Sequence, residues 1–309
     1  MKRLLTDFEE LFDLDYRIRG TRVGDLVEQA VVDLDEHPRP DWGTPGAATE
    51  IASENGRFVK FYYVPHLFPG MELKLRLAHK LQFHLLPRSV PPDAPVSVAA
   101  VLESYCHLSG DLFGWEMLAD GRFLIWIVDL SGHGVQAGLA SAMLKVIIDN
   151  LRERGRVSSL VAELNAALSR CARSDSLFAT GFFLVVGRDG SASFTSAGHP
   201  AVLVRDPDGN LRELRSNSGP VGIFPEQRYV AEETRFSEGE TLLFYTDGLL
   251  EASDDQEREF GTERIRGVLL QDRDNEPEAI TSALYKAVAA HQDMAKLDDD
   301  ITFLAARIL

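Results

Sequence analysis

Four short acidic segments are the part of this sequence best suited to chemistry. Each places an aspartate at or near the end of an apolar run that reads as a β-strand, and glycine lies close to three of them. Carboxylates on rigid strand ends are the ligands that hard divalent cations prefer. The pattern predicts metal-dependent hydrolysis, with phosphoester chemistry as its first candidate. The segments are Ser109-Gly110-Asp111, Asp129-Leu130-Ser131-Gly132-His133-Gly134, Thr246-Asp247-Gly248 and Asp298-Asp299-Asp300-Ile301-Thr302.

The segment around Asp129 combines a cation ligand with an anion-binding element. Asp129 follows the apolar run 123–128, and Gly132 and Gly134 let the backbone approach a ligand closely. Apolar residues at helical spacing follow over 134–151, so a helix N-terminus that attracts anions is expected at the same place. A carboxylate and a helix N-terminus together suit a metal–phosphate site. The plain alternative is a strand-to-helix turn in which Asp129 only caps the helix.

The number of carboxylates fits a pair of metal ions, which need roughly three to five between them. In such sites a metal-bridging water attacks phosphorus in line, so the protein needs no nucleophilic side chain. His133 is placed where it could protonate the leaving serine oxygen. The simpler interpretation of His133 is a helix-start residue that bonds to the backbone. We therefore expect no catalytic group beyond the metal-bound water, with His133 as the one candidate.

Composition limits the class of protein. The chain has 309 residues, 45% of them hydrophobic, which is enough for one large domain or for one large and one small domain. Its formal net charge of −16 disfavours nucleic acid and anionic membranes as partners. No apolar run approaches the roughly 20 residues that span a bilayer, and residues 1–12 lack a signal-peptide core. We therefore expect a cytoplasmic protein.

Strand-like runs joined by tight turns dominate the sequence from residue 88 onward. Three pairs of runs flank an Asp-Gly dipeptide, which is typical of a two-residue antiparallel hairpin. The run 123–128 is apolar on both faces, which predicts a strand in the interior of a sheet. Helices predicted at 134–151, 158–172 and 276–291 interrupt the strands, so the chain is expected to be α+β. The hairpin pairs are 116–119 with 122–128, 182–187 with 191–195, and 201–205 with 211–215.

The N-terminal part of the chain carries no chemical motif. Asn55-Gly56 between two strand-like runs predicts a hairpin. Residues 71–86 have apolar positions on one helical face, and Pro87 ends the pattern. This helix either packs on its own domain or acts as a dimerising, signal-carrying linker. The predicted organisation is an N-terminal regulatory or interaction segment at 1–70, a linker helix at 71–87 and a catalytic domain at 88–309.

Several of these segments, in this order, resemble the SpoIIE-type bacterial serine/threonine phosphatases of the metal-dependent protein phosphatase 2C (PPM) superfamily. The resemblance runs from about Leu75 to Leu309 and includes Gly261 in Glu259-Phe260-Gly261-Thr262. Ordered motifs at suitable separations are more specific than any single one. The matching segments are Leu81-Gln82-Phe83-His84-Leu85-Leu86-Pro87, Asp129-Leu130-Ser131-Gly132-His133-Gly134, Ser196-Ala197-Gly198-His199-Pro200, Thr246-Asp247-Gly248-Leu249-Leu250-Glu251-Ala252 and Asp299-Asp300-Ile301-Thr302.

The resemblance implies an α/β/β/α sandwich of two antiparallel sheets flanked by helix pairs, with two Mn²⁺ or Mg²⁺ ions at the sheet edges. It implies that Asp129 bridges the two ions. Asp111 and the Leu130 carbonyl would serve one ion, directly or through water, and Asp247 and Asp299 would hold the other.

Two features of the acidic segments need comment. Asp299 is preferred to its neighbours Asp298 and Asp300 because it aligns with the aspartate two positions before the hydrophobic residue of the closing strand. The first motif of the family commonly begins Gly-Gly-Asp and ends in another Asp, whereas Ser109 and Gly114 stand here. The missing acid at position 114 is expected to weaken metal binding without excluding catalysis.

The resemblance also implies a function and a substrate. The protein would hydrolyse phosphoserine or phosphothreonine on a regulatory protein, typically an anti-sigma-factor antagonist in partner switching. The alternative is a catalytically weak phosphatase-fold domain that acts as a partner-binding module. If the 71–86 helix is a dimerising linker, a homodimer through this helix is a further possible partner. A shift of the helix pair 134–151 and 158–172 would alter metal recruitment.

Overall fold

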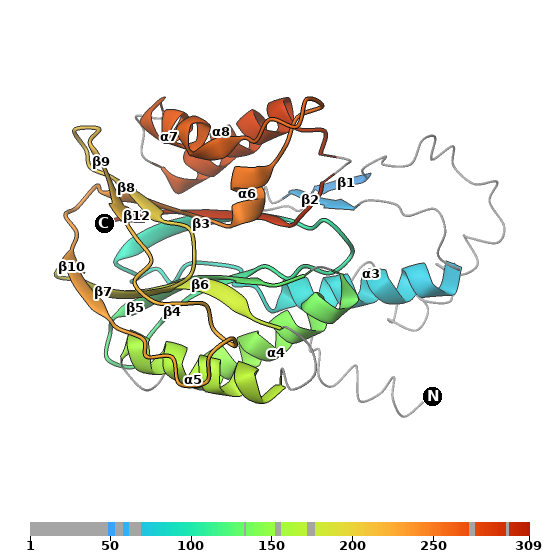
Figure 1. Cartoon of the computed structure of the whole chain (residues 1–309). Coiled ribbons are helices and arrows are strands. Elements are labelled where there is room, and N and C mark those ends of the chain that lie inside the picture. Colours follow the sequence, from blue (N-terminus) through green and yellow to red (C-terminus); the bar gives the residue numbers. More distant parts are fainter. Residues whose placement is uncertain are drawn as a thin grey trace, which may run out of the picture. The chain divides into compact units, whose positions relative to one another are not determined.

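Two antiparallel β-sheets of five strands each form the centre of the fold, and helices cover the outer face of each sheet (Figure 1). This computed structural model describes residues 49–52, 58–61, 69–132, 134–151, 156–171, 177–271, 276–294 and 297–309, all within one compact unit. The succession of helices, sheet, sheet and helices confirms the predicted α/β/β/α sandwich. In these residues, no helix combines the length and the apolar character needed to cross a membrane.

The first sheet has the strand order β10-β7-β6-β5-β4. Two helices, α4 and α5, pack on its outer face through apolar residues that recur at helical spacing. Leu144 and Ile148 of α4 and Leu164 and Leu168 of α5 are fully buried there. The bounds of these elements are β4 Leu112–Met117, β5 Phe123–Leu130, α4 Val135–Leu151, α5 Val157–Cys171, β6 Ala179–Val186, β7 Ser191–Ala197 and β10 Glu232–Arg235.

The second sheet has the strand order β3-β12-β11-β8-β9. Helices α7 and α8 cover it, and Ile265 of α7 with Ile280, Leu284 and Val288 of α8 form a core with its outer face. The short helix α6 starts directly after β11 and packs on β12. The bounds are β3 Val96–Glu103, β8 Val202–Arg205, β9 Leu211–Leu214, β11 Thr241–Tyr245, α6 Asp247–Glu251, α7 Gly261–Gln271, α8 Pro277–His291 and β12 Ile301–Ile308.

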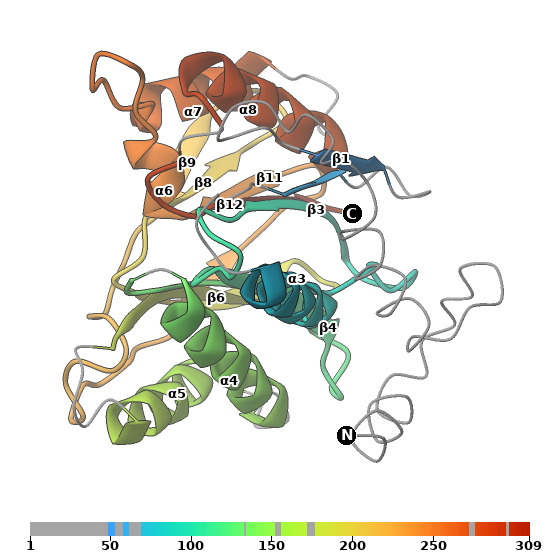
Figure 2. The same ribbon diagram turned by 90° about the vertical axis from the view of Figure 1, so that its right-hand side faces the viewer.

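Three elements precede these sheets. β1 (Thr49–Ala52) and β2 (Phe58–Phe61) pair as an antiparallel hairpin, which confirms the predicted strand pairing, while Asn55-Gly56 lies outside the described residues. α3 (Pro69–His84) runs alongside α4 in both ribbon views (Figures 1 and 2). The helix predicted at 71–86 therefore exists, shifted by one half-turn toward the N-terminus.

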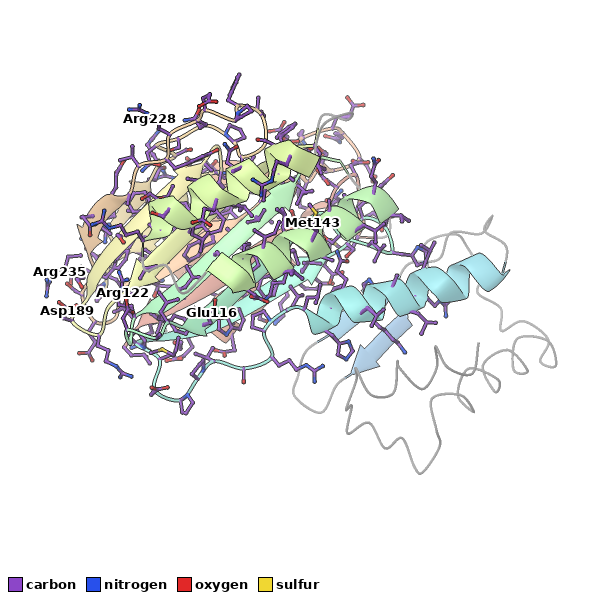
Figure 3. The ribbon with its side chains drawn as sticks, turned by 90° about the horizontal axis from the view of Figure 1, so that it is seen from below. Glu116, Arg122, Met143, Asp189, Arg228 and Arg235 are labelled. Atoms are coloured by element: carbon purple, nitrogen blue, oxygen red, sulfur yellow. The ribbon has the colours of Figure 1, made fainter. Side chains whose placement is uncertain are left out.

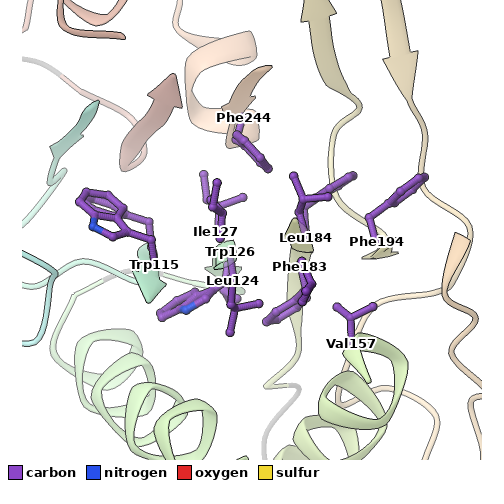
Figure 4. Packing of buried hydrophobic residues seen from close by; sticks show 14 of the residues in the cluster. Trp115, Leu124, Trp126, Ile127, Val157, Phe183, Leu184, Phe194 and Phe244 are labelled. Carbon is purple, nitrogen blue, oxygen red and sulfur yellow. The ribbon is translucent and has the colours of Figure 1, made fainter. Parts of the chain in front are cut away.

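The two sheets are joined by aromatic and aliphatic side chains in the space between them. Phe182 of β6 stacks on Phe194 of β7 at 5.2 Å and meets the ring of Phe244 from β11 edge-on at 5.6 Å. Figure 4 shows Phe194 and Phe244 on one side of the first sheet and Trp126, with the helices, on the other. Edge-to-face and offset-stacked rings are favoured arrangements of aromatic pairs. The contact fixes the spacing of the sheets.

Strand alternation places Asp129 in the space between the sheets. Side chains two positions apart share a face of a strand, so Asp129 lies on the same face as Ile127. Ile127 is paired in register with Phe182, which contacts Phe244 of the other sheet. Thr246, two residues beyond Phe244, extends from the second sheet toward the same space. The two central acidic segments therefore face each other.

The charged hairpin turns lie at the opposite end of the first sheet. Figure 3 shows Arg122, Asp189 and Arg235 grouped there. Arg235 donates a hydrogen bond to the backbone carbonyl of Asp189 at 2.7 Å. In the register of β5 and β6, the Asp129 end and the Arg122 end are the two ends of one ladder. The arginine-rich turns are thus remote from the acidic segments.

Most predicted elements are present, with three differences. The helices predicted at 134–151, 158–172 and 276–291 correspond to α4, α5 and α8. β4 begins at Leu112, earlier than the predicted start at 116, and Asp129 lies inside β5 rather than after it. α7 was not predicted, because only Ile265 and Leu269 of this helix are buried and two of its positions are glycine.

Candidate active site

Asp111 and Thr246 are joined by a hydrogen bond that crosses the space between the sheets. The Thr246 hydroxyl donates to the Asp111 carboxylate at 2.9 Å, and both side chains are buried. The same hydroxyl accepts the backbone N–H of Thr302 at 3.2 Å. The first, third and fourth acidic segments therefore meet at one edge, where the loop before β4, the end of β11 and the start of β12 come together.

Asp300 holds the first acidic segment in place. Its carboxylate accepts the backbone N–H groups of Tyr105 and Gly110, each at 2.7 Å. The side chain is 4% exposed, and burial raises its pKa above the ordinary value. A carboxylate whose oxygens both accept buried N–H groups is fixed in orientation. Asp299, the preceding residue, is exposed, and its carboxylate accepts the backbone N–H of Asp300 at 2.8 Å.

Two glycines let these segments approach more closely than any side chain would allow. A Cβ at Gly248 would lie 2.0 Å from the carbonyl oxygen of Asp300. A Cβ at Gly110 would lie 3.0 Å from the carbonyl oxygens of both Leu130 and Gly132. Gly248 therefore brings α6 against the start of β12, and Gly110 brings the first segment against the second. All four acidic segments are in direct backbone contact with a neighbour.

The electrostatics of Asp129 reflect the crowding of carboxylates. Burial raises its pKa to about 8, with further contributions from the charges of Asp247 and Asp299. Burial also raises the pKa of Asp111 well above its ordinary value, and the charges of Asp129 and Asp300 act in the same direction. Carboxylates that are desolvated close to like charges resist ionisation. A divalent cation would remove this penalty.

The donor set fits divalent metal ions. Asp111 and Asp129 from the first sheet face Asp247 and Asp299 from the second, and each charge is felt by at least one of the others. Within the described residues, no three aspartate, glutamate, histidine or cysteine side chains already form a metal-binding group. Mg²⁺ and Mn²⁺ take few direct carboxylates and keep several waters, so pairs of carboxylates with backbone carbonyls suit them. The Leu130 carbonyl, against which Gly110 packs, is such a donor.

Of two histidines in the family-like segments, His133 and His199, the structure describes only His199. His133 lies outside the described residues. His199 is buried, and burial lowers its pKa to about 3. Its Nδ1 is 2.9 Å from the hydroxyl of Thr180, which is the register partner of Asp129 on β6. A neutral, buried histidine that bonds to a neighbour of Asp129 has a structural role.

The departure at Gly114 has a structural counterpart across the strand. Gly114 is paired in register with Trp126, and a Cβ at position 114 would lie 2.4 Å from the indole ring. Trp126 occupies the helix side of the sheet (Figure 4). Phe113 and Trp115 flank Gly114 on the strand, so a side chain at 114 would point to the face opposite theirs. The indole ring of Trp126 therefore fills the space that an acidic side chain at position 114 would need.

Gln82 of α3 lies in one of the segments that resemble the family, but the sequence did not identify its buried contact with the site. Its amide donates to the carbonyl of Ser109 at 2.6 Å and to the hydroxyl of Ser141 on α4 at 2.7 Å. Its carbonyl accepts the N–H of Ser109 at 3.0 Å. Gln82 thus links α3, α4 and the residue two before Asp111. The signals in the sequence were a polar glutamine within an apolar helical pattern and its place in a segment that resembles the family.

The fold and the edge where the acidic segments meet define a two-sheet α/β/β/α sandwich domain with an acidic edge suited to divalent metal ions. Residues 119–309 match the family model described as Stage II sporulation protein E (SpoIIE). The chain belongs to this SpoIIE family. The match covers both sheets apart from β3 and β4, and it includes Asp129, Asp247 and Asp299.

Curated relatives are similar over much of this chain but are longer. Protein IcfG from Synechocystis sp. is 27% identical over 261 residues, covering 75% of this chain and 41% of that protein. Phosphoserine phosphatase RsbP from Bacillus subtilis is 27% identical, covering 58% of this chain and 45% of that protein. Phosphoserine phosphatase RsbU from the same organism is 24% identical, covering 76% and 70%. The chain thus spans less than half the length of the first two.

Solved structures share the fold. The SiaA-PP2C domain of Pseudomonas aeruginosa superposes with a TM-score of 0.68 at 22% identity, covering 77% of this chain and 97% of that chain. The phosphatase domain of SpoIIE from Bacillus subtilis, with a fragment of its regulatory domain, gives a TM-score of 0.61 at 20% identity, covering 72% and 64%. RsbX in complex with magnesium gives 0.53 at 18% identity, covering 69% and 96%.

Proposed function

We propose that this protein is a metal-dependent phosphatase that removes phosphate from phosphoserine or phosphothreonine on a regulatory protein in the cytoplasm. The observation that carries the proposal is the meeting of four acidic segments at one edge between the sheets, with Asp111 and Asp129 opposite Asp247 and Asp299. The relatives named phosphoserine phosphatase support the reaction. An anti-sigma-factor antagonist in partner switching is the proposed substrate.

In this proposal the acidic residues have distinct tasks. Asp129 would be a ligand shared by two Mn²⁺ or Mg²⁺ ions, Asp111 and the Leu130 carbonyl would serve one of them, and Asp247 and Asp299 would hold the other. When bound, such ions activate water and stabilise the negative charge that develops on phosphorus oxygens. Asp300 does not bind metal; it positions the loop that carries Asp111 through its two backbone hydrogen bonds.

The test is phosphate release from a serine-phosphorylated antagonist protein by the purified full chain with Mn²⁺ or Mg²⁺. We expect release that is abolished by EDTA and restored by either ion. Asp129→Asn is expected to lower the rate at least 1000-fold, because it removes the ligand shared by both ions. Asp189→Asn, in the exposed hairpin at the far end of the first sheet, is the matched control and should keep the rate within twofold.

The outcomes separate the proposal from its alternative. Undiminished release by Asp129→Asn, or by protein treated with EDTA, would contradict the two-metal site. Binding of the phosphorylated antagonist without any release would instead identify a catalytically weak, partner-binding module. Absence of both release and binding would rule out this substrate class.

Regulation through the N-terminal part is a second element of the proposal. The contact of Gln82 with Ser109 and Ser141 connects α3 to the metal-binding edge and to α4. A displacement of α3 would therefore disturb the loop that carries Asp111. The assignment of 1–70 as a regulatory segment, of 71–87 as a linker and of 88–309 as the catalytic domain stays a prediction. So does a homodimer through α3, for which Leu77, 43% exposed, is a candidate contact.

A further inference from the structure

The loop between β9 and β10 presents two neighbouring apolar side chains to solvent. Ile223 is 43% exposed and Phe224 is 59% exposed. Single exposed apolar residues are ordinary on protein surfaces, but an aromatic and a branched aliphatic residue in sequence on one loop form a small patch. Such a patch needs an explanation if the loop that carries it is held in one conformation.

A buried amide holds this loop. Asn165 of α5 is 1% exposed and makes three hydrogen bonds to the loop. Its carbonyl oxygen accepts the N–H of Gly222 at 2.7 Å, and its amide donates to the carbonyls of Phe224 at 3.0 Å and Pro225 at 3.3 Å. Gly222 has a backbone φ of +96°, which residues other than glycine rarely adopt. The backbone beneath the exposed pair is therefore specified by the fold.

The loop is continuous with the catalytic edge. Val221 and Ala179 exchange two backbone hydrogen bonds of 2.9 Å. Ala179 is the register partner of Leu130, and the next pair in this ladder is Thr180 with Asp129. The patch therefore begins two residues beyond a backbone contact with β6, the strand that pairs with the end of β5 carrying Asp129. Figure 2 shows the yellow-orange loop beside α5, on the same side of the fold as α6.

The location of Ile223 and Phe224 near the catalytic edge favours the protein substrate as the partner that binds them. The catalytic edge of a protein phosphatase must contact the protein that carries the phosphoserine, so an apolar patch near that edge is well placed to contact the same protein. Apolar side chains on a preordered backbone bind with little entropic cost, and aromatic residues are frequent anchors of interfaces.

We propose that Ile223 and Phe224 form a docking surface for the phosphoprotein substrate beside the catalytic edge. This inference rests on the proposed phosphatase function and names the surface that distinguishes a folded protein substrate from a small phosphate ester. The small ester is too short to reach the loop and the catalytic edge together.

The experiment compares two substrates for each variant of the full chain with Mn²⁺. One is p-nitrophenyl phosphate, and the other is a serine-phosphorylated anti-sigma-factor antagonist. We expect Phe224→Ser and Ile223→Ser to lower the ratio of kcat/KM for the protein to kcat/KM for the ester at least tenfold, mainly through KM. Phe224→Leu should restore most of the ratio. Leu270→Ser, on α7 and 45% exposed, is the matched control and should leave the ratio unchanged.

Each outcome decides the question. An unchanged ratio in Phe224→Ser and Ile223→Ser would overturn the docking surface while leaving the phosphatase intact. Loss of oligomers in Phe224→Ser during sedimentation, with an unchanged ratio, would assign the patch to a second copy of the chain and also overturn it. Absence of ester hydrolysis by the unaltered protein would instead count against the proposed function itself.

Discussion

Asp300 and Gly110 are joined by a hydrogen bond of 2.7 Å although 190 positions separate them in the sequence. The carboxylate of Asp300 accepts the N–H of Gly110, the residue directly before Asp111. Through this bond the start of the last strand fixes the loop before β4. The relationship assigns different tasks to three consecutive aspartates that are identical in chemistry.

Conservative changes in the Asp298–Asp300 run should therefore have three different effects. Asp298→Asn should keep the phosphatase rate within twofold because its side chain is exposed. Asp299→Asn should lower the rate at least 100-fold while thermal stability is retained, since a metal ligand is lost. Asp300→Asn should lower the free energy of unfolding by about 1–3 kcal/mol, because an amide NH₂ would face a backbone donor. Rate assays and thermal denaturation measure these effects; equal effects of all three would contradict the assignment.

Gly248→Ala should disrupt the site without removing a ligand. The added Cβ would lie 2.0 Å from the carbonyl oxygen of Asp300, so α6 and the start of β12 must separate. A displacement of about 1 Å in an active site costs about 100-fold in rate. The control is Gly267→Ala in α7, where an added Cβ would meet no atom within 4 Å. This substitution should raise the free energy of unfolding by up to about 1 kcal/mol. Normal turnover by Gly248→Ala would show that this contact is dispensable.

Gly114→Ala tests whether position 114 serves packing or metal binding. The methyl group would overlap the Trp126 ring, so we expect a loss of about 1–3 kcal/mol in stability. The change is expected to leave the Mn²⁺ dependence of the rate within about threefold, since the position faces the helices. Gly114→Asp should be at least as destabilising. Tighter metal binding by Gly114→Asp, measured by titration calorimetry, would show that the missing acid matters after all.

The raised pKa of Asp129 predicts a pH dependence of stability. The folded protein holds this proton up to about pH 8, whereas an aspartate in the unfolded chain loses it near its ordinary value of 3.8. The folded state therefore binds more protons in this window, and stability falls as pH rises from about 4 to 8. Melting temperatures in EDTA should fall by several degrees from pH 5 to 8. Asp129→Asn should flatten the profile; an equally steep profile in that variant would assign the slope to other groups.

Gln82→Ala should weaken the coupling between α3 and the catalytic edge. The change removes four buried hydrogen bonds and leaves the carbonyl of Ser109 without its 2.6 Å partner. We expect the concentration of Mn²⁺ needed for half-maximal rate to rise about tenfold, because the loop carrying Asp111 is loosened. Lys80→Ala, on the exposed side of the same helix, should leave it unchanged. If the change lowered stability but left the Mn²⁺ requirement unaltered, Gln82 would have only a packing role.

Local features of the sequence determined the elements and the kind of chemistry. Asp-Gly pairs predicted the hairpins because only a few residues adopt the required turn. Helical periodicity predicted α4, α5 and α8, and apolar runs predicted the strands that carry Asp129 and Asp247. These signals lie within a few residues of one another, so no knowledge of distant partners is needed. The resemblance to the family then implied which aspartates would hold which metal ion.

The tertiary structure decided what depends on residues far apart in the chain. It separated Asp299 from Asp300, because one faces solvent while the other accepts N–H groups from the loop before β4. It placed Trp126 over Gly114, which explains why that position lacks a side chain. Burial and hydrogen-bond partners are set only when the sheets pack together. The spacing of neighbouring residues in the sequence therefore cannot predict them.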